Sequence, residues 1–430
     1  MPELLNVNNL KTRLAHPGFR RYFKNTGWMF VGQAFNLLVA FFVGAYVARY
    51  LGPANFGLMN YAISFSLLFS FLAGFGIDTI LNRDLVKFPE KQDELLGTGF
   101  WIKLGGGLLA AIIINLISFL ATADILTRLL ILIFSLTFVW QSFSVISIFF
   151  QARVLSKKTV SVQVFVTLVS SLVKISFIFL NLGVIWLMAV YVLDAVNLAL
   201  GLFFLYQRSY KKSFFRYFDF SLSKTLLKNS WPLMLTSIAV VIYSKIDQIF
   251  IKQLLDATAL GLYAISSKLT EICYYVPAII CSSLFPAMIN AMPNPKIYHL
   301  RLKRLLSLLF VLAVGLAIFL FLVAKPMIIW LFGGSYALSV ATFRVYIWSI
   351  IPSFVMVAIS YYLIAENLVR VYLYMTVIGA VANVVLNLFL IPRAGLIGGA
   401  LATLISYSLV PLSLVLFPAM RKRLKSLTYA

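Results

Sequence analysis

The segment Leu51-Gly52-Pro53-Ala54-Asn55-Phe56-Gly57-Leu58 decides how this chain is organised, because it occurs a second time as Leu255-Asp256-Ala257-Thr258-Ala259-Leu260-Gly261-Leu262. Identical residues in the two copies lie 204 positions apart, and the same offset joins Asn25 to Asn229. A further phrase, Tyr61-Ala62-Ile63-Ser64, recurs two residues out of step as Tyr263-Ala264-Ile265-Ser266. We interpret these matches as an internal duplication that divides the chain into two similar halves.

The composition is that of an integral membrane protein. Of the 430 residues, 62% are hydrophobic and 11% are charged, and the mean hydropathy is +0.97. Charge-free stretches such as 25–48 and 394–420 exceed the ~20 residues that a helix needs to cross a bilayer. In a polytopic membrane protein, two parallel repeats indicate a central cavity that opens alternately to either side of the bilayer.

Apolar runs between charged, proline and glycine breaks predict an all-α polytopic membrane protein with twelve transmembrane helices in two six-helix bundles. The predicted spans are 27–48, 58–78, 98–119, 126–150, 160–180, 184–206, 230–251, 261–285, 305–324, 341–364, 371–391 and 396–418. The predicted domains are a cytoplasmic tail at 1–26, an N-terminal bundle at 27–206, a basic cytoplasmic linker at 207–228, a C-terminal bundle at 229–418 and a basic cytoplasmic tail at 419–430.

Lysine and arginine are distributed unequally between alternate connections. One set of connections, which includes both chain ends, carries 26 of them, whereas the other carries only Arg49, Arg128, Lys252, Lys325 and Arg393. The positive-inside rule assigns the first set to the cytoplasm, so we expect a multi-pass protein of the cytoplasmic (inner) membrane with both termini inside. The net charge of +23 then reflects topology and attraction to anionic membrane lipids, and no nucleic acid partner is expected.

The longest inner connection, residues 207–218, is basic with interleaved aromatic side chains. This composition suits the headgroup region of a bilayer. We expect the segment to lie there as an amphipathic bridge between the halves.

Ionisable side chains inside the predicted spans are candidates for function, because each costs at least ~2.5–3.5 kcal/mol at a helix centre unless water or a partner is present. Lys103, Asp78 and Arg344 lie near span ends, where reaching the interface is expected to suffice. Three deeper cations are predicted to bind an anionic substrate in a hydrated cavity: Lys174, Lys245 and Lys268. Three deeper carboxylates are predicted to serve ion coupling or as counter-charges: Asp194, Asp247 and Glu271.

Spacing limits how these groups can pair. Lys268 and Glu271 are three residues apart and can meet on one helix face. Lys245 and Asp247 are two apart and project to different sides, so at least one of them should reach another helix or the cavity. The counter-groups considered for them are Lys174 and Asp194 of the other half.

No metal site or cofactor is expected. Cys273 and Cys281 lie eight residues apart in one predicted helix, beyond disulfide reach, and are expected to be buried thiols. His16 and His299 lack cysteine or acidic companions at ligand spacing.

Several phrases resemble landmarks of a known family. The segment from Val47 to Gly57 resembles the first-loop signature of the bacterial polysaccharide, or Wzx-type oligosaccharide, flippases of the multidrug/oligosaccharidyl-lipid/polysaccharide superfamily. Later landmarks follow in the family's order, and the resemblance as a whole runs from about Asn25 to Tyr407. Among the landmarks, Asp247 is the charged intramembrane position. The later landmarks are Ile246-Asp247-Gln248, Gly261-Leu262-Tyr263-Ala264, Phe332-Gly333-Gly334-Ser335-Tyr336, and Ala382 to Pro392 with Gly395 and Gly398-Gly399-Ala400.

This resemblance implies a MATE-like fold and a secondary transporter, not an enzyme. It would move an undecaprenyl-pyrophosphate-linked oligosaccharide across the membrane by alternating access for surface polysaccharide synthesis. Protons or sodium are the implied coupling ions, and a polysaccharide assembly machinery is an implied partner. The lipid II flippase branch typically has fourteen helices and basic residues in its first helix, and many drug-exporting relatives have an acidic residue in that helix. Twelve predicted spans and the absence of charge from Asn25 to Ala48 therefore favour the sugar-lipid branch.

Three alternatives stay open. A MATE-type drug or organic-cation antiporter would have the same fold and a cavity dominated by carboxylates. A membrane polysaccharide polymerase or ligase would need a large outer loop with catalytic residues, whereas all predicted outer connections are short. A membrane scaffold would tolerate replacement of the deep charges. The sequence has no Walker-type phosphate loop and no nucleophile elbow, which argues against intrinsic ATP hydrolysis or acyl chemistry.

Overall fold

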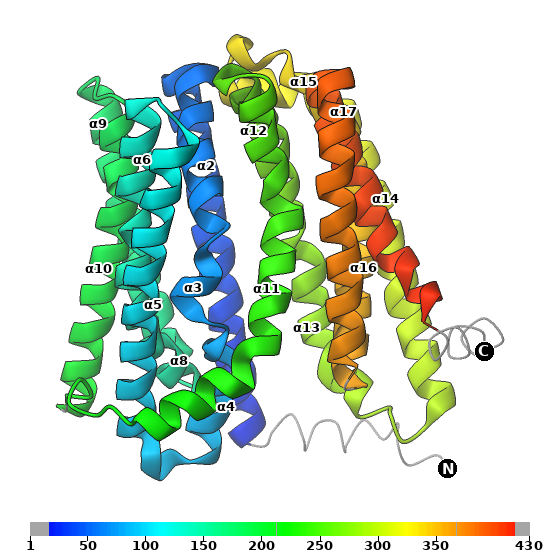
Figure 1. The fold of residues 1–430 in the computed structure, drawn as a ribbon. Coiled ribbons are helices and arrows are strands. Elements are labelled where there is room, and N and C mark those ends of the chain that lie inside the picture. The colour runs from blue at the N-terminus through cyan, green and yellow to red at the C-terminus, as the bar shows by residue number, and fades with distance from the viewer. Residues whose placement is uncertain (1–16, 212, 367, 418–430) are drawn as a thin grey trace. The chain divides into compact units, whose positions relative to one another are not determined.

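The computed structural model describes residues 17–417 except 212 and 367, and all secondary structure in this part of the chain is helical (Figure 1). Nine of its helices are long and apolar enough to cross a membrane. The protein is therefore a multi-pass helical membrane protein. His16, most of the predicted N-terminal tail and all of the predicted C-terminal tail lie outside the described residues, so the placement of both termini stays a prediction.

The helices follow one another with short connections. In chain order they are α2 (Pro17–Leu67), α3 (Ser70–Gly74), α4 (Ile77–Lys87), η2 (Pro89–Lys91), α5 (Gln92–Ala121), α6 (Ile125–Ser135), α7 (Thr137–Trp140), η3 (Gln141–Phe143), α8 (Ser144–Ala152), α9 (Ser156–Phe179), α10 (Val184–Tyr210), α11 (Phe220–Leu254), α12 (Ala257–Cys273), α13 (Tyr275–Ile289), α14 (Pro295–Phe332), η4 (Gly334–Tyr336), α15 (Ser339–Tyr346), η5 (Ile347–Ser349), α16 (Ile350–Ala365), α17 (Val369–Leu412) and η6 (Ser413–Leu416).

Two of the long helices are interrupted by a glycine in a conformation that other residues rarely adopt. Gly52 in α2 has φ 68° and ψ 171°, and Gly395 in α17 has φ 56° and ψ −134°. Each helix therefore consists of two helical segments that meet at a sharp turn. At Gly52 the following residue is Pro53, which suits the first turn of a new helix. The count of twelve spans nevertheless stays a prediction.

Contacts group the chain into two compact units, which we describe separately. Unit 1 contains residues 1–44, 70–123 and 132–234, and unit 2 contains 45–69, 124–131 and 235–430. Residues 45–69 and 124–131 thus belong with the second half of the chain. The bundle boundaries at 27–206 and 229–418 stay a prediction about the helices' arrangement.

The predicted linker contributes to the core of unit 1. Helix α10 continues to Tyr210 and α11 begins at Phe220, where Asp219 caps it by accepting hydrogen bonds from the Ser221 and Leu222 amides at 2.7 and 3.1 Å. Between them, Phe214 is completely buried in a cluster that includes Phe100, Phe149 and Tyr206. Phe214 therefore anchors the connection to the helices of unit 1, and the expectation that the segment lies in the headgroup region as an amphipathic bridge stays a prediction.

Candidate functional site

In unit 1, Lys174 and Asp194 form an ion pair between neighbouring helices. Lys174 on α9 places its Nζ 3.2 Å from Oδ2 of Asp194 on α10 and 3.1 Å from Oγ of Ser170. The same ammonium lies 4.8 Å from the ring centroid of Tyr191. The two charged side chains are 18% and 27% exposed, so the pair is accessible without being fully solvated.

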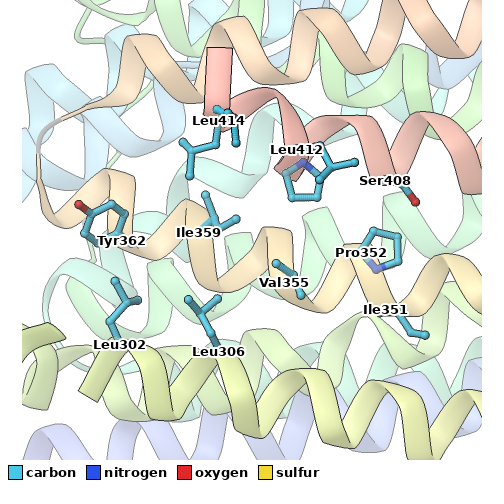
Figure 2. Close-up of a pocket in the computed structure, with 12 residues that line it drawn as sticks. Leu302, Leu306, Ile351, Pro352, Val355, Ile359, Tyr362, Ser408, Leu412 and Leu414 are labelled. Carbon is cyan, nitrogen blue, oxygen red and sulfur yellow. The ribbon is translucent and has the colours of Figure 1, made fainter. Parts of the chain in front are cut away.

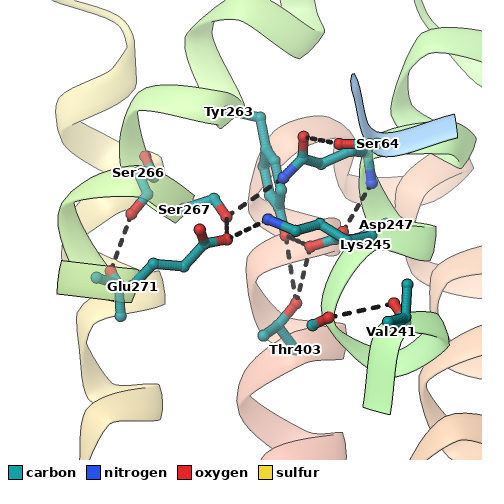
Figure 3. A network of polar contacts seen from close by, with 12 residues as sticks. Ser64, Val241, Lys245, Asp247, Tyr263, Ser266, Ser267, Glu271 and Thr403 are labelled. Atoms are coloured by element: carbon teal, nitrogen blue, oxygen red, sulfur yellow. Dashed lines mark hydrogen bonds and ion pairs between the residues drawn. The ribbon is translucent and has the colours of Figure 1, made fainter. Parts of the chain in front are cut away.

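In unit 2, Lys245 and Glu271 form a second ion pair (Figure 3). The Nζ of Lys245 on α11 donates to Oε1 of Glu271 on α12 at 2.7 Å, and the Ser267 hydroxyl donates to the same oxygen at 2.8 Å. These charged side chains are 19% and 36% exposed. Lys245 therefore reaches another helix, as its spacing from Asp247 required. Its counter-ion is Glu271, whereas Lys174 and Asp194 pair with one another.

Asp247 lies beside this pair and is almost completely buried. Its Oδ2 accepts hydrogen bonds from the hydroxyl of Tyr263 on α12 at 2.5 Å and from that of Thr403 on α17 at 3.4 Å. Its Oδ1 accepts from the backbone amide of Gln248 at 2.7 Å. The Thr403 hydroxyl has a single proton and also lies 3.1 Å from the Gly399 carbonyl, so the Tyr263 hydroxyl and the Gln248 amide chiefly replace the water that a buried carboxylate loses.

Buried polar side chains extend the network around Asp247. The Ser64 hydroxyl on α2 donates to Oε1 of Gln248 at 2.7 Å, and the Gln248 amide lies 3.4 Å from Oγ of Ser267. On the far side of Thr403, Asn383 donates to Oγ of Ser406 at 2.9 Å, and the Ser406 hydroxyl donates to the Thr403 carbonyl at 3.0 Å. The network therefore joins α2, α11, α12 and α17.

Sequence reasoning assigned no role to these uncharged members, since isolated serine, threonine, asparagine and tyrosine residues are common in membrane helices. Some of them nevertheless lie within the family landmarks, namely Gln248, Tyr263, Asn383 and Asn387. A usable signal was present in Asn383 and Asn387. Two amides four residues apart lie on one helix face, and Asn387 donates to Oδ1 of Asn383 at 2.9 Å. Within the described residues, Oδ1 of Asn387 is buried and has no hydrogen-bond partner.

The remaining intramembrane cations have different surroundings. Lys268 is half-buried, with its Nζ 4.6 Å from the ring centroid of Phe56. Arg344 is half-buried with its guanidinium 5.1 Å from the ring centroid of Phe321. For Lys103, the expectation that it reaches the interface was wrong, because its side chain is 1% exposed.

Lys103 is buried because a helix break brings a partner to it. Gly76, with φ 69°, precedes α4 and starts that helix where the carboxylate of Asp78 can meet α5. The Nζ of Lys103 lies 2.7 Å from Oδ1 of Asp78 and 2.6 Å from Oγ of Ser144. These contacts satisfy the ammonium without exposing it.

A hollow of about 490 Å³ in unit 2 is distinct from these charged groups (Figure 2). Apart from Ser408 and the Tyr362 hydroxyl, its lining side chains are hydrocarbon, so it offers no cation to a phosphate. It is lined by Leu302, Leu306, Ile351, Pro352, Val355, Ile359, Tyr362, Ser408, Pro411, Leu412, Leu414 and Val415. Cys273 and Cys281 are buried free thiols, as expected. No cluster of metal-ligating residues occurs in the part of the chain that the structure describes.

Known proteins with similar folds are membrane transporters. The structure resembles that of the lipid II flippase MurJ in an inward closed conformation, with a TM-score of 0.74, 17% identity, and coverage of 92% of this chain and 87% of that one. It also resembles an inward-facing multidrug resistance MATE family transporter of the MOP superfamily, with a TM-score of 0.69, 15% identity, and coverage of 92% and 96%. At these identities the likeness shows the fold alone.

The sequence comparisons show the family. Protein 1 of the Lsg locus of Haemophilus influenzae is 22% identical over 409 residues, which cover 91% of this chain and 97% of that protein. The MatE family profile matches residues 232–389. The profile of the family described as polysaccharide biosynthesis protein matches residues 22–292, which is more than half of the chain. The chain therefore belongs to the polysaccharide biosynthesis protein family.

Proposed function

We propose that this protein is a flippase for an undecaprenyl-pyrophosphate-linked oligosaccharide repeat unit. It takes the lipid-linked sugar at the cytoplasmic leaflet of the cytoplasmic membrane and releases it at the outer leaflet by alternating access, in the service of surface polysaccharide synthesis. The observation that carries the proposal is the presence of half-buried lysines, each held by polar or aromatic neighbours, inside membrane-spanning helices of a chain from this family.

The lysines supply the chemistry that a pyrophosphate headgroup needs. Lys174, Lys245 and Lys268 are neither fully solvated nor fully buried. An ammonium in such a position attracts anions more strongly than one in bulk water, because the effective dielectric constant is lower. Partial exposure also leaves room for an anion to approach. In this proposal the anion that the lysines bind is the phosphate part of the substrate.

Ion coupling is assigned to the network around Asp247. Its carboxylate, the Thr403 and Tyr263 hydroxyls and the nearby asparagine amides are hard oxygen groups, which suit a proton or a sodium ion. Taking up a cation would neutralise a buried charge that is held by donors from α11, α12 and α17. A change in ion occupancy would therefore alter how firmly these three helices are held together.

A MATE-type organic-cation antiporter is the nearest alternative, since the fold and the MatE profile match also fit it. Such a cargo would need carboxylates that are free to bind it. Asp194 and Glu271 are instead engaged by lysines, and Asp247 by hydroxyl and amide donors. The same two ion pairs also engage Lys174 and Lys245, so the preference for a lipid-linked sugar over an organic cation rests on the polysaccharide biosynthesis profile, which matches residues 22–292.

The test is deletion of the gene followed by chemical identification of the lipid-linked glycan in the inner leaflet. We expect an undecaprenyl-pyrophosphate oligosaccharide to accumulate, and to disappear when the wild-type gene is restored. Lys174→Gln and Lys245→Gln should restore export poorly, whereas the exposed Lys303→Gln should restore it fully. Unchanged levels of all lipid-linked glycans, together with full activity of the two intramembrane variants, would refute the proposal.

A further inference from the structure

The two copies of the duplicated segment pack against each other within unit 2. A Cβ atom added to Gly57 would lie 2.8 Å from the backbone nitrogen of Gly261, and closer still to the carbonyl oxygen of Ala257. A Cβ atom added to Gly261 would lie 2.7 Å from the carbonyl carbon of Pro53, and closer still to its oxygen. Real Cβ atoms essentially never approach other atoms within 3.0 Å, so both positions require glycine.

The contact is self-complementary. Pro53 precedes Gly57 by four residues, and Ala257 precedes Gly261 by four, so all four residues are equivalent positions of the duplication. Each glycine packs against the backbone one turn before the other glycine. This is the arrangement of a two-fold symmetric interface, reproduced inside one chain. Small residues spaced by four allow such close backbone approach between membrane helices.

Aromatic side chains seal the end of this contact. Phe56 and Tyr336 are completely buried, and their rings meet edge to face with centroids 6.2 Å apart. The Tyr336 hydroxyl donates to the carbonyl of Ala48 at 2.7 Å, and Ala48 is also completely buried. Water is therefore excluded where α2 and α12 turn, next to Gly52 and Asp256. The charge distribution predicts that this end of the helices is the outer one.

We propose that the Gly57–Gly261 contact is the outer closure of the transport pathway, which the two repeats form and which must separate when cargo leaves outward. The inference rests on the proposed transport function. The seal is made of close backbone packing, the contact between the buried Phe56 and Tyr336 rings, and one tyrosine hydrogen bond to a carbonyl. Such close packing has no room for a Cβ atom at either glycine, so one added methyl group is enough to hold the two segments apart.

The symmetry gives the proposal a distinctive consequence. Gly57→Ala and Gly261→Ala insert equivalent methyl groups into one interface, so each variant should open it to a similar extent. The double variant should open it by less than the product of the two single effects, because neighbouring substitutions in one contact are not independent. Two unrelated structural glycines would instead show unequal and independent effects.

The experiment measures access to Ala48→Cys from the outer side, in a chain whose Cys273 and Cys281 are replaced by alanine. A membrane-impermeant maleimide is applied to spheroplasts and the rate of labelling is followed. We expect slow labelling in the parent and rates about five- to 150-fold higher in Gly57→Ala and in Gly261→Ala, the range that typical overpacking corresponds to. Gly44→Ala is the matched control on α2, since nothing lies within 4 Å of its added methyl group.

A second variant keeps the test decisive if alanine at Gly57 or Gly261 lowers the yield of folded protein. Tyr336→Phe removes only the hydrogen bond to Ala48 and should also raise the labelling rate. Folded variants that label at the parent rate, or that label only from the cytoplasmic side, would overturn the outer closure. Because labelling needs no cargo, that outcome is separate from failure of the flippase proposal, which the deletion strain reports.

Discussion

Replacing Tyr263 by phenylalanine tests whether Asp247 is ionised in this conformation. The change removes one hydroxyl and leaves the buried ring in place. The hydroxyl lies 2.5 Å from Oδ2 of Asp247, a separation typical of O–H···O⁻ bonds to charged carboxylates. Without it, the nearest hydroxyl to Oδ2 is that of Thr403 at 3.4 Å, whose single proton also has the Gly399 carbonyl as an acceptor at 3.1 Å.

The size of the expected loss of unfolding free energy distinguishes an ionised Asp247 from a neutral one. A hydrogen bond to a charged group contributes about 1.5–3 kcal/mol. A hydrogen bond between membrane helices averages only about 0.6 kcal/mol in double-mutant cycles. We therefore expect Tyr263→Phe to lower the free energy of unfolding by about 1.5–3 kcal/mol. In the double variant with Asp247→Asn, most of this loss should disappear, because the charge that the hydroxyl served is gone.

Equilibrium unfolding in mixed micelles of increasing SDS content, followed by tryptophan fluorescence, measures these differences. Tyr407→Phe is the control, since Tyr407 is a buried ring in the same unit whose hydroxyl makes no hydrogen bond among the described residues. A loss of about 0.6 kcal/mol or less for Tyr263→Phe would refute the ionised carboxylate. Additivity of the two substitutions within about 0.5 kcal/mol would do the same.

Three further predictions concern unit 1 and the connection that precedes α6. Gly97→Ala should sharply reduce the thermal stability of the purified protein, because its Cβ would lie 2.9 Å from the carbonyl carbon of Tyr217. Gly105→Ala is the control and should be neutral or stabilising, because nothing lies within 4 Å of its added Cβ. Asp78→Ala should cost about 3–5 kcal/mol in SDS unfolding by leaving the buried Lys103 without its counter-ion, and Lys103→Met should cost less, since Asp78 is 57% exposed and stays hydrated. Hydrogen bonds, chiefly from the Thr127 hydroxyl, hold the pKa of Asp124 below its usual value near 3.8. The carboxylate therefore stabilises the fold above that pH, so the deficit of about 1 kcal/mol expected for Asp124→Ala at pH 7 should vanish in melts performed as the pH falls through the lowered pKa.

The membrane fold was predictable because its signal is local. Charge-free runs, short connections and turn glycines report directly on helices that cross a bilayer. Gly395 belongs to one of the family landmarks, and α17 is interrupted at this residue. The free, buried state of Cys273 and Cys281 also followed from their spacing along one predicted span.

The pairing of the deep charges was not predictable, since it depends on which helices are neighbours. Lys245 and Glu271 are 26 residues apart, and nothing in their local sequence distinguishes this pairing from one between Lys245 and Asp194. The expectation that Lys103 reaches the interface was wrong for a related reason. Its place near a span end gave no sign of burial, because the break at Gly76 that brings Asp78 to it is a matter of backbone conformation.

The duplication shows the same limit of prediction from the sequence. The offset of 204 residues identified Gly57 and Gly261 as equivalent positions. Equivalence alone does not say that the two positions touch, because duplicated helices can lie far apart in one molecule. Only the backbone geometry shows that each glycine packs against the backbone of the other copy.

The two ion pairs constrain how an anionic cargo can be both bound and released. Lys174 and Lys245 each have a resident carboxylate, so a phosphate that binds either lysine replaces an existing interaction. At an effective dielectric constant of 20, a pair of unit charges 4 Å apart interacts by about 4 kcal/mol, and the displaced carboxylate recovers hydration. The net gain is therefore a difference between two similar energies, and it favours a pyrophosphate because that group carries more charge than the carboxylate it replaces. An unpaired lysine would hold the headgroup more tightly and release it more slowly, which a carrier that must deliver its cargo cannot tolerate.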